Sequence, residues 1–162
     1  MRVHESAIAS DEFRTIGRYV AMKKKARRVP SEILARLRAI CLQLPEAYEE
    51  HAWVGTRWRI RKQTFAHVLI VESGWPPAYA KVVGSAGPVC IVTFRSKIAE
   101  LNAHSFAKHP FFRPGWWPDI VGLVIETRTD WNEAAYLLAE SYRVMAPKKL
   151  AESIAHRVVT GE

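Results

Sequence analysis

The stretch Trp53–Val71, with the sequence WVGTRWRIRKQTFAHVLIV, decides the fold of this chain. From Thr56 to Ile60 the residues alternate T-R-W-R-I, and this period of two is typical of a strand with one buried face. Phe65–Val71 is a second stretch rich in β-forming residues. The stretch therefore predicts a β-hairpin that closes near Arg61-Lys62-Gln63-Thr64.

The alternation divides the first strand into a core side and an arginine side. The side chains expected in the core are Thr56, Trp58 and Ile60, and those expected opposite them are Arg57, Arg59 and Arg61. Successive arginines would be about 6.6 Å apart, with Lys62 at the tip of the hairpin. One interpretation is a solvated face of an antiparallel sheet, and the other is a row of phosphate contacts.

Positive charge is concentrated in two segments of the chain. The formal net charge is +8, of which residues 23–28 (KKKARR) carry +5 and residues 51–71, which contain no acidic residue, carry +4. This concentration predicts a polyanionic partner, with nucleic acid as the first candidate and an anionic membrane surface as the second. The candidate phosphate-binding residues are Lys23, Lys24, Lys25, Arg27, Arg28, Arg57, Arg59, Arg61 and Lys62.

Length and composition indicate one globular domain. The chain has 162 residues, of which 49% are hydrophobic and 25% charged. It contains no apolar run long enough to span a membrane, and its N-terminus lacks the apolar core of a signal peptide, so we expect a cytoplasmic protein. Cys41 and Cys90 are expected to be buried free thiols. We interpret residues 1–29 as an extension with a basic arm (residues 23–28), and residues 30–162 as one domain.

The spacing of apolar residues, together with helix-capping and helix-breaking residues, predicts the remaining elements. Helices are expected at Ser31–Leu44 with Ser31 as N-cap, from Ser96 to about Ala107, and from Asp130 to about Met145 with an Asp130/Glu133 capping box. Further strands are expected at Tyr79–Val83, Val89–Phe94 and Ile120–Ile125. The order α-β-β-β(-β)-α-β-α predicts an α+β fold, with an antiparallel sheet of four to five strands and helices on one face.

From about Ile33 to Met145 the chain resembles the MmcQ/YjbR family. The residues that carry the resemblance are Leu44-Pro45-Glu46, Glu50, Trp53, Gly55, Trp58-Arg59-Ile60, Phe65-Ala66, Phe112-Arg113-Pro114 and Ser141-Tyr142. The resemblance implies a frataxin-like (CyaY-like) fold, DNA binding through a "double wing", and no known catalytic activity. The Arg61-Lys62-Gln63 turn, the Trp116-Trp117 loop and the N-terminal extension depart from the family pattern.

The sequence gives little indication of metal binding or catalysis. The six histidines form no HxxxH or HExxH arrangement, and the first helix carries Arg36 and Arg38 against a single Glu32, the wrong charge for iron. Glu46, Glu49, Glu50 and His51 are interpreted as a solvated turn. The chain has no GxSxG, P-loop or dinucleotide motif, so we expect neither an enzyme nor a cofactor.

Two functional hypotheses follow. The first is DNA binding, largely through phosphates and without sequence specificity, by the basic hairpin and the basic arm. The second is a protein- or ligand-binding module whose surface is the aromatic loop, residues 111–117. One basic face uniting residues 23–28 with 57–62 would favour the first, and an exposed apolar patch at the aromatic loop the second. The tryptophans considered for base stacking are Trp53, Trp58, Trp75, Trp116 and Trp117, of which Trp58 is expected in the core.

Overall fold

A computed structural model of the chain describes residues 28–159. Its elements are α2 (Ser31–Cys41), β1 (Tyr48–His51), β2 (Thr56–Ile60), β3 (Gln63–Val71), α3 (Pro77–Val83), β4 (Val89–Arg95), α4 (Lys97–Leu101), β5 (Phe111–Phe112), β6 (Ile120–Ile125), α5 (Trp131–Met145) and α6 (Lys148–Val159). Of the predicted arm only Arg28 falls within the described residues. Lys23, Lys24, Lys25 and Arg27 lie outside them, and the domain boundary at residue 29 stays a prediction.

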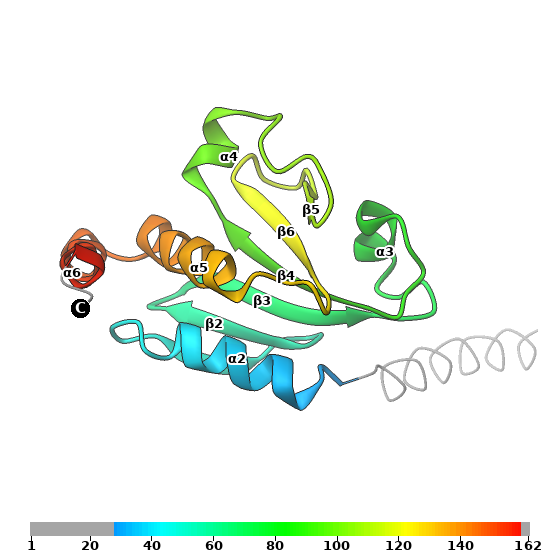
Figure 1. Cartoon of the computed structure of the whole chain (residues 1–162), viewed down its shortest axis with the longest axis horizontal. Helices are drawn as coiled ribbons and strands as arrows, with labels where there is room; N and C mark the ends of the chain where they lie inside the picture. Colours follow the sequence, from blue (N-terminus) through cyan, green and yellow to red (C-terminus); the bar gives the residue numbers. More distant parts are fainter. Residues whose placement is uncertain (1–27, 160–162) are drawn as a thin grey trace, which may run out of the picture.

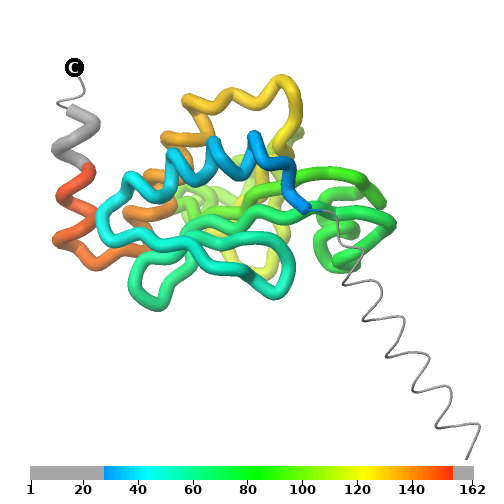
Figure 2. The backbone as a smooth tube through the Cα atoms, turned by 90° about the horizontal axis from the view of Figure 1, so that it is seen from below, coloured from blue at the N-terminus to red at the C-terminus, as the bar shows by residue number. Residues whose placement is uncertain are grey.

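The strands form one antiparallel sheet in the order β1-β2-β3-β4-β6-β5. Helices α2 and α5 cover one face of it, which we call the inner face (Figures 1 and 2). The core lies between these layers, and its largest fully buried side chains include Trp58, Phe65 and Tyr142. The α+β prediction is confirmed, although the sheet has six strands because β1 and β5 are short edge strands that the sequence pattern did not reveal.

The central hairpin and the long helix follow the sequence pattern closely. Along β2, Thr56, Trp58 and Ile60 are buried while the arginines between them are half-buried. Strand β3 pairs with β2 across the two-residue turn Arg61-Lys62. At the start of α5, one carboxylate oxygen of Asp130 accepts hydrogen bonds from two first-turn amides, at 3.0 and 3.1 Å. The predicted hairpin and the predicted Asp130 cap are therefore confirmed.

The predicted strand Tyr79–Val83 is wrong, because this segment is part of helix α3. Pro77 occupies the first helical turn, where its missing N–H costs nothing, and Gly84 ends the helix with a left-handed φ of 74°. Tyr79 and Val83, four residues apart, pack with Ala80 against Leu69, Val71 and Ile91. The apolar spacing is therefore helical.

Two other helix boundaries differ from the prediction. Ser96 does cap α4, accepting a hydrogen bond from the Ala99 amide, but this helix ends at Leu101 because Asn102 is extended. Its apolar side chains Ile98 and Leu101 are 58% and 81% exposed. Helix α2 ends at Cys41, and the position before it is Pro30, so Ser31 is the first helical residue and not the N-cap.

Helix α3 lies against the face of the sheet opposite α2 and α5, which we call the outer face. Its partners Leu69 and Ile91 are paired across β3 and β4 and form a small second core. The prediction of helices on one face therefore holds for α2 and α5 but not for α3.

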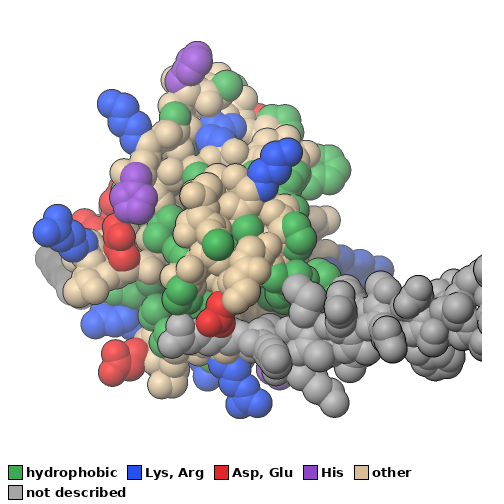
Figure 3. All heavy atoms as spheres, turned by 90° about the vertical axis from the view of Figure 1, so that its right-hand side faces the viewer, with side chains coloured by type: hydrophobic (Ala, Val, Ile, Leu, Met, Phe, Trp, Pro, Cys, Tyr) green, Lys and Arg blue, Asp and Glu red, His purple; other side chains and the backbone are tan. Residues whose placement is uncertain are grey.

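Figure 3 shows the end of the molecule that carries α3, where Lys and Arg side chains lie apart from one another instead of forming one basic patch.

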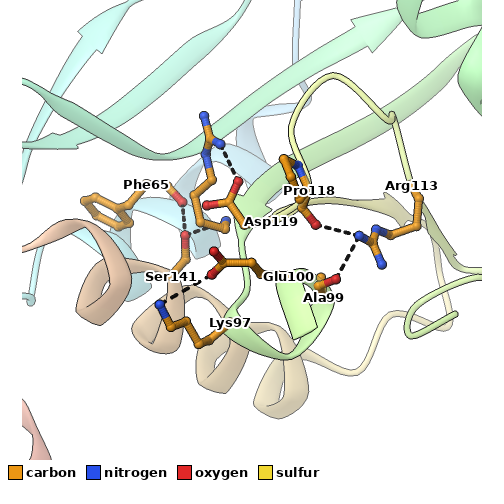
Figure 4. A network of polar contacts seen from close by, with 9 residues as sticks. Phe65, Lys97, Ala99, Glu100, Arg113, Pro118, Asp119 and Ser141 are labelled. Atoms are coloured by element: carbon orange, nitrogen blue, oxygen red, sulfur yellow. Dashed lines mark hydrogen bonds and ion pairs between the residues drawn. The ribbon is translucent and has the colours of Figure 1, made fainter. Parts of the chain in front are cut away.

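Ser141 of α5 joins the helix to the two central strands. Its hydroxyl donates to the Phe65 carbonyl oxygen at 2.6 Å and accepts from the Arg95 amide at 2.7 Å (Figure 4). These two backbone groups lie just beyond the last paired residues of β3 and β4, Ala66 and Phe94. The hydroxyl therefore satisfies a buried donor and a buried acceptor at the point where the strands separate.

Replacing Ser141 by Ala is expected to lower the free energy of unfolding by about 2–5 kcal/mol, since both buried backbone groups lose their partner. Chemical denaturation of parent and variant measures this difference. Ser153→Ala is the matched control: among the described residues the Ser153 hydroxyl bonds only to the Leu150 carbonyl, on the exposed surface of α6, so the change should alter stability by less than about 0.5 kcal/mol. Equal effects of the two substitutions would contradict the role of Ser141.

Candidate functional site

One row of side chains crosses the outer face of the sheet. The strand register places Arg57 opposite His67, His67 opposite Thr93, and Thr93 opposite Gly122. Residues directly opposite each other on antiparallel strands project from the same face. The basic hairpin and the centre of the outer face are therefore parts of one surface.

The arginines of β2 are paired with carboxylates from the preceding segment. Glu50 lies opposite Arg57 on β1 and forms ion pairs with Arg57 and with Arg59, the latter at 3.1 Å. Arg61 reaches Glu46 at 3.3 Å. The segment that we interpreted as a solvated turn therefore includes strand β1, and its acids neutralise part of the hairpin charge.

The electrostatic state of Glu50 follows from this pairing. Partial desolvation acts to raise the pKa of the Glu50 carboxyl, but the hydrogen bonds and charges of Arg57 and Arg59 outweigh it and lower the pKa. Glu50 is therefore ionised at neutral pH. It holds the two guanidinium groups side by side along β2.

Two side chains fix the hairpin turn. Arg59 donates to the Lys62 carbonyl oxygen at 2.5 Å, and the Tyr48 hydroxyl donates to the Arg61 carbonyl oxygen at 2.6 Å. The Arg59 side chain is only 21% exposed, whereas that of Arg61 is 60% exposed. Lys62 is exposed and makes no ion pair with any residue that the structure describes. Arg59 therefore supports the turn, while Arg61 and Lys62 present their charge to solvent.

A hollow of about 170 Å³ lies on the outer face beside this row. Its walls are Tyr79 from α3 and the loop tryptophans Trp116 and Trp117, and Thr93 and His67 belong to the sheet beneath. The rings of Tyr79 and Trp116 meet edge to face with centroids 4.9 Å apart. The aromatic loop and the sheet therefore form one pocket, a relation that the sequence did not reveal.

His67 is the titratable group of this hollow. Its Nε2 hydrogen-bonds the Val54 carbonyl oxygen, which can only accept, so Nε2 carries the proton and Nδ1 faces the Tyr79 hydroxyl at 3.5 Å. Burial lowers the pKa of His67 and outweighs the hydrogen bond to the Val54 carbonyl, which acts to raise it; the nearby positive charge of Arg57 lowers the pKa further. The imidazole is therefore neutral at neutral pH.

Arg95 stands at the rim of the hollow. Its guanidinium is ion-paired with Asp119 at 2.7 Å and lies 5.9 Å from the ring centroid of Trp117. The charge of Arg95 is thus balanced by a neighbouring carboxylate, while its plane contacts an indole. The rim is polar but carries little net charge.

Arg113 holds the loop that carries the tryptophans. Its guanidinium donates to five backbone carbonyls, those of Ala99, Asn102, Ala103, Ser105 and Pro118. Figure 4 shows the Arg113 guanidinium bonded to the carbonyls of Ala99, in helix α4, and of Pro118, just after the aromatic loop. The loop is therefore closed on itself by one side chain. The sequence marked Arg113 only as part of the family resemblance, since no local pattern indicates carbonyl binding.

The predicted basic residues do not all lie together. Arg57, Arg59, Arg61 and Lys62 share the hairpin, but Arg28 borders a second hollow with Gly55 and Thr56, at the start of β2. Lys62 follows the other end of β2, so Arg28 and Lys62 are separated by the length of this strand (Figure 1). Arg28, the one residue of the arm that the structure describes, therefore does not form one continuous basic face with Lys62.

Neither a metal-binding cluster nor a membrane-spanning helix is found in the described part of the chain. No three His, Cys, Asp or Glu side chains there are arranged to hold a metal ion, and none of its helices is long and apolar enough to cross a membrane. Cys41 and Cys90 are buried free thiols, as predicted. Burial raises the pKa of the Cys90 thiol to about 12 and also raises that of Cys41, so neither is a reactive thiolate.

Comparison with known proteins gives one match. A protein-family model described as YjbR matches residues 42–144, which include the hairpin, the hollow and helix α5 up to its last residue but one. No curated protein and no solved structure matches the chain.

The buried neutral His67 predicts a pH-dependent stability. Because its pKa is lowered in the folded state, the unfolded chain takes up the proton first, and stability present above about pH 6.5 is lost as the pH falls. His67 contributes at most about 1.4 kcal/mol per pH unit to the slope of the unfolding free energy against pH. Denaturation of the parent and of His67→Gln between pH 7.5 and 5 should show a flatter profile for the variant, whereas the exposed His104→Gln should leave the profile unchanged. Identical profiles for parent and His67→Gln would contradict this account.

Proposed function

The chain belongs to the YjbR family, and from this premise we propose that it is a non-catalytic DNA-binding protein that contacts phosphates through the β2–β3 hairpin. The observation that carries the proposal is the hairpin turn, where Arg61 and Lys62 present two exposed cations side by side. Cationic side chains that meet phosphates supply sequence-independent affinity. The proposed binding is therefore largely non-specific.

The ion pairs of the hairpin are compatible with this role. Pairs between partly exposed groups contribute only about 0–1 kcal/mol each, so a phosphate can replace Glu46 beside Arg61 or Glu50 beside Arg57 at small cost. Four cations on the hairpin face two carboxylates, which leaves the surface positive. The carboxylates also keep the guanidinium groups extended before DNA arrives.

The hairpin residues contribute unequally in this proposal. Lys62 and Arg61 are the main phosphate contacts, and Arg57, whose side chain is 38% exposed, is a weaker one. Arg59 acts through the turn that it supports. Arg28 lies near the start of β2 and would be a second contact, on DNA long enough to reach both ends of that strand. The other proposed arm residues, Lys23, Lys24, Lys25 and Arg27, lie outside the described residues.

The aromatic loop supports a second candidate function. Trp116 and Trp117 are 40% and 60% exposed, which suits contact with a protein or a small planar ligand. The hollow beside them is smaller than the 300–1,000 Å³ typical of small-molecule sites, so it does not suit a large cofactor. Both tryptophans border the outer face that also carries Arg57.

The test removes the two exposed cations of the turn without disturbing the fold. Arg61 has a φ of 55°, which glycine adopts without strain, so Arg61→Gly deletes the charge and keeps the turn. Combined with Lys62→Ala, it should flatten the slope of log K against log salt by about 1.8, because each lost phosphate contact removes about 0.9. Fluorescence anisotropy with two unrelated duplexes measures the slope, and the loss should be equal for both.

Lys97→Ala is the control for charge, since it removes a cation from α4, which lies apart from the β2–β3 turn (Figure 1). This variant should have the same slope of log K against log salt as the parent, within experimental error. A parent that binds neither duplex at about 50 mM salt would refute the proposal. A folded double variant with the parental slope would show that the hairpin is not the contact surface.

A further inference from the structure

We propose that the hollow on the outer face receives one unstacked base of a single DNA strand. The inference rests on the proposed DNA binding and adds the kind of strand that the site prefers. The residues that would contact the base are Tyr79, Thr93, Trp116 and Trp117.

The size of the hollow selects a single ring system. Its volume is about 170 Å³. Small-molecule sites usually exceed 300 Å³, so a complete cofactor is too large. One base, with its sugar and phosphate left outside, is of the right scale.

The walls have the chemistry of a stacking site. Trp117 is 60% exposed and Trp116 is 40% exposed, yet both are held in place. Trp116 contacts the edge of Tyr79, Trp117 lies under Arg95, and Arg113 closes the loop that carries them. Ordered aromatic faces bind bases with little loss of side-chain freedom, and stacking tolerates any base.

The interior of the hollow favours a neutral group over an anion. His67 is neutral, and the charge of Arg95 is balanced by Asp119. The Tyr79 hydroxyl faces Nδ1 of His67, which leaves lone pairs of its oxygen to accept from an N–H group of a base, such as the imide N–H of thymine. A phosphate would therefore find no unpaired cation inside, whereas a base would find both rings and a hydrogen-bond acceptor.

The cations needed for the backbone of the strand lie beside the hollow. Arg57 is directly opposite His67, and His67 is opposite Thr93, so Arg57 and Thr93 are two strand spacings apart, or about 10 Å. A phosphate at Arg57 therefore places a neighbouring base within reach of the hollow. In a duplex that base would remain stacked and paired, so the site predicts a preference for single strands.

The test compares two labelled oligonucleotides of equal length and charge, one of thymidines and one of abasic residues. Anisotropy titrations at the same salt should show the thymidine strand bound about 5- to 150-fold more tightly by the parent, the range expected for stacking of one base. Trp117→Ala should remove most of this ratio, and Trp117→Phe should restore much of it because phenylalanine retains a π-face.

Tyr136→Ala is the matched control, since Tyr136 is an equally exposed aromatic residue, 58% exposed, on α5. It should leave the ratio unchanged. Equal affinities for the thymidine and abasic strands, or a ratio insensitive to Trp117→Ala, would overturn the inference. So would thymidine alone binding as tightly as the strand, which would indicate a small-molecule site.

The outcomes separate this inference from the proposed function. If the two strands bind equally but duplex binding retains its dependence on Arg61 and Lys62, the hollow is not a base site and DNA binding by the hairpin stands. If neither strand nor any duplex binds at about 50 mM salt, both ideas fail.

Discussion

The hydroxyl of Ser141 sets the geometry on which the rest of the molecule depends. It bridges the Phe65 carbonyl and the Arg95 amide at the point where β3 and β4 stop pairing. Beyond this point β3 leads back to the hairpin turn, and β4 leads on to α4 and the aromatic loop. The outer-face hollow includes Phe65 and Arg95 in its lining, so it lies over the same divergence. The buried hydroxyl of Ser141 on the inner face and the hollow on the outer face therefore lie at the same point of the sheet.

Much of this arrangement could be predicted from local sequence, and the reasons for the misses are specific. The T-R-W-R-I alternation and the Asp130 cap reflect interactions between near neighbours, and both hold in the structure. Strand β1 was missed because an edge strand of four residues with two glutamates has no apolar period. This segment forms a strand because it pairs with β2, where Glu50 lies opposite Arg57. Helix α3 was missed because seven residues are too few to separate a period of two from one of 3.6.

The candidate site, too, could be predicted only in part from local sequence. The sequence identified the hairpin cations but gave Arg57, Arg59 and Arg61 equal weight, because period and charge carry no information about partners. In the structure Arg59 is engaged with Glu50 and a turn carbonyl, while Arg61 is largely exposed. Arg113 is the strongest example. It binds carbonyls contributed by residues from Ala99 to Pro118, and such convergence is visible only in three dimensions.

The carboxylates of β1 have one more consequence, for the solubility of the chain. Strand β1 is the last strand on its side of the sheet, so its outward edge could pair with a strand of another molecule. Charged side chains on such an edge discourage this association. Glu49 and Glu50 therefore protect the edge while they moderate the charge of the arginine row. Replacing them with neutral residues would therefore leave the arginine row more positive and the edge of β1 less protected against self-association.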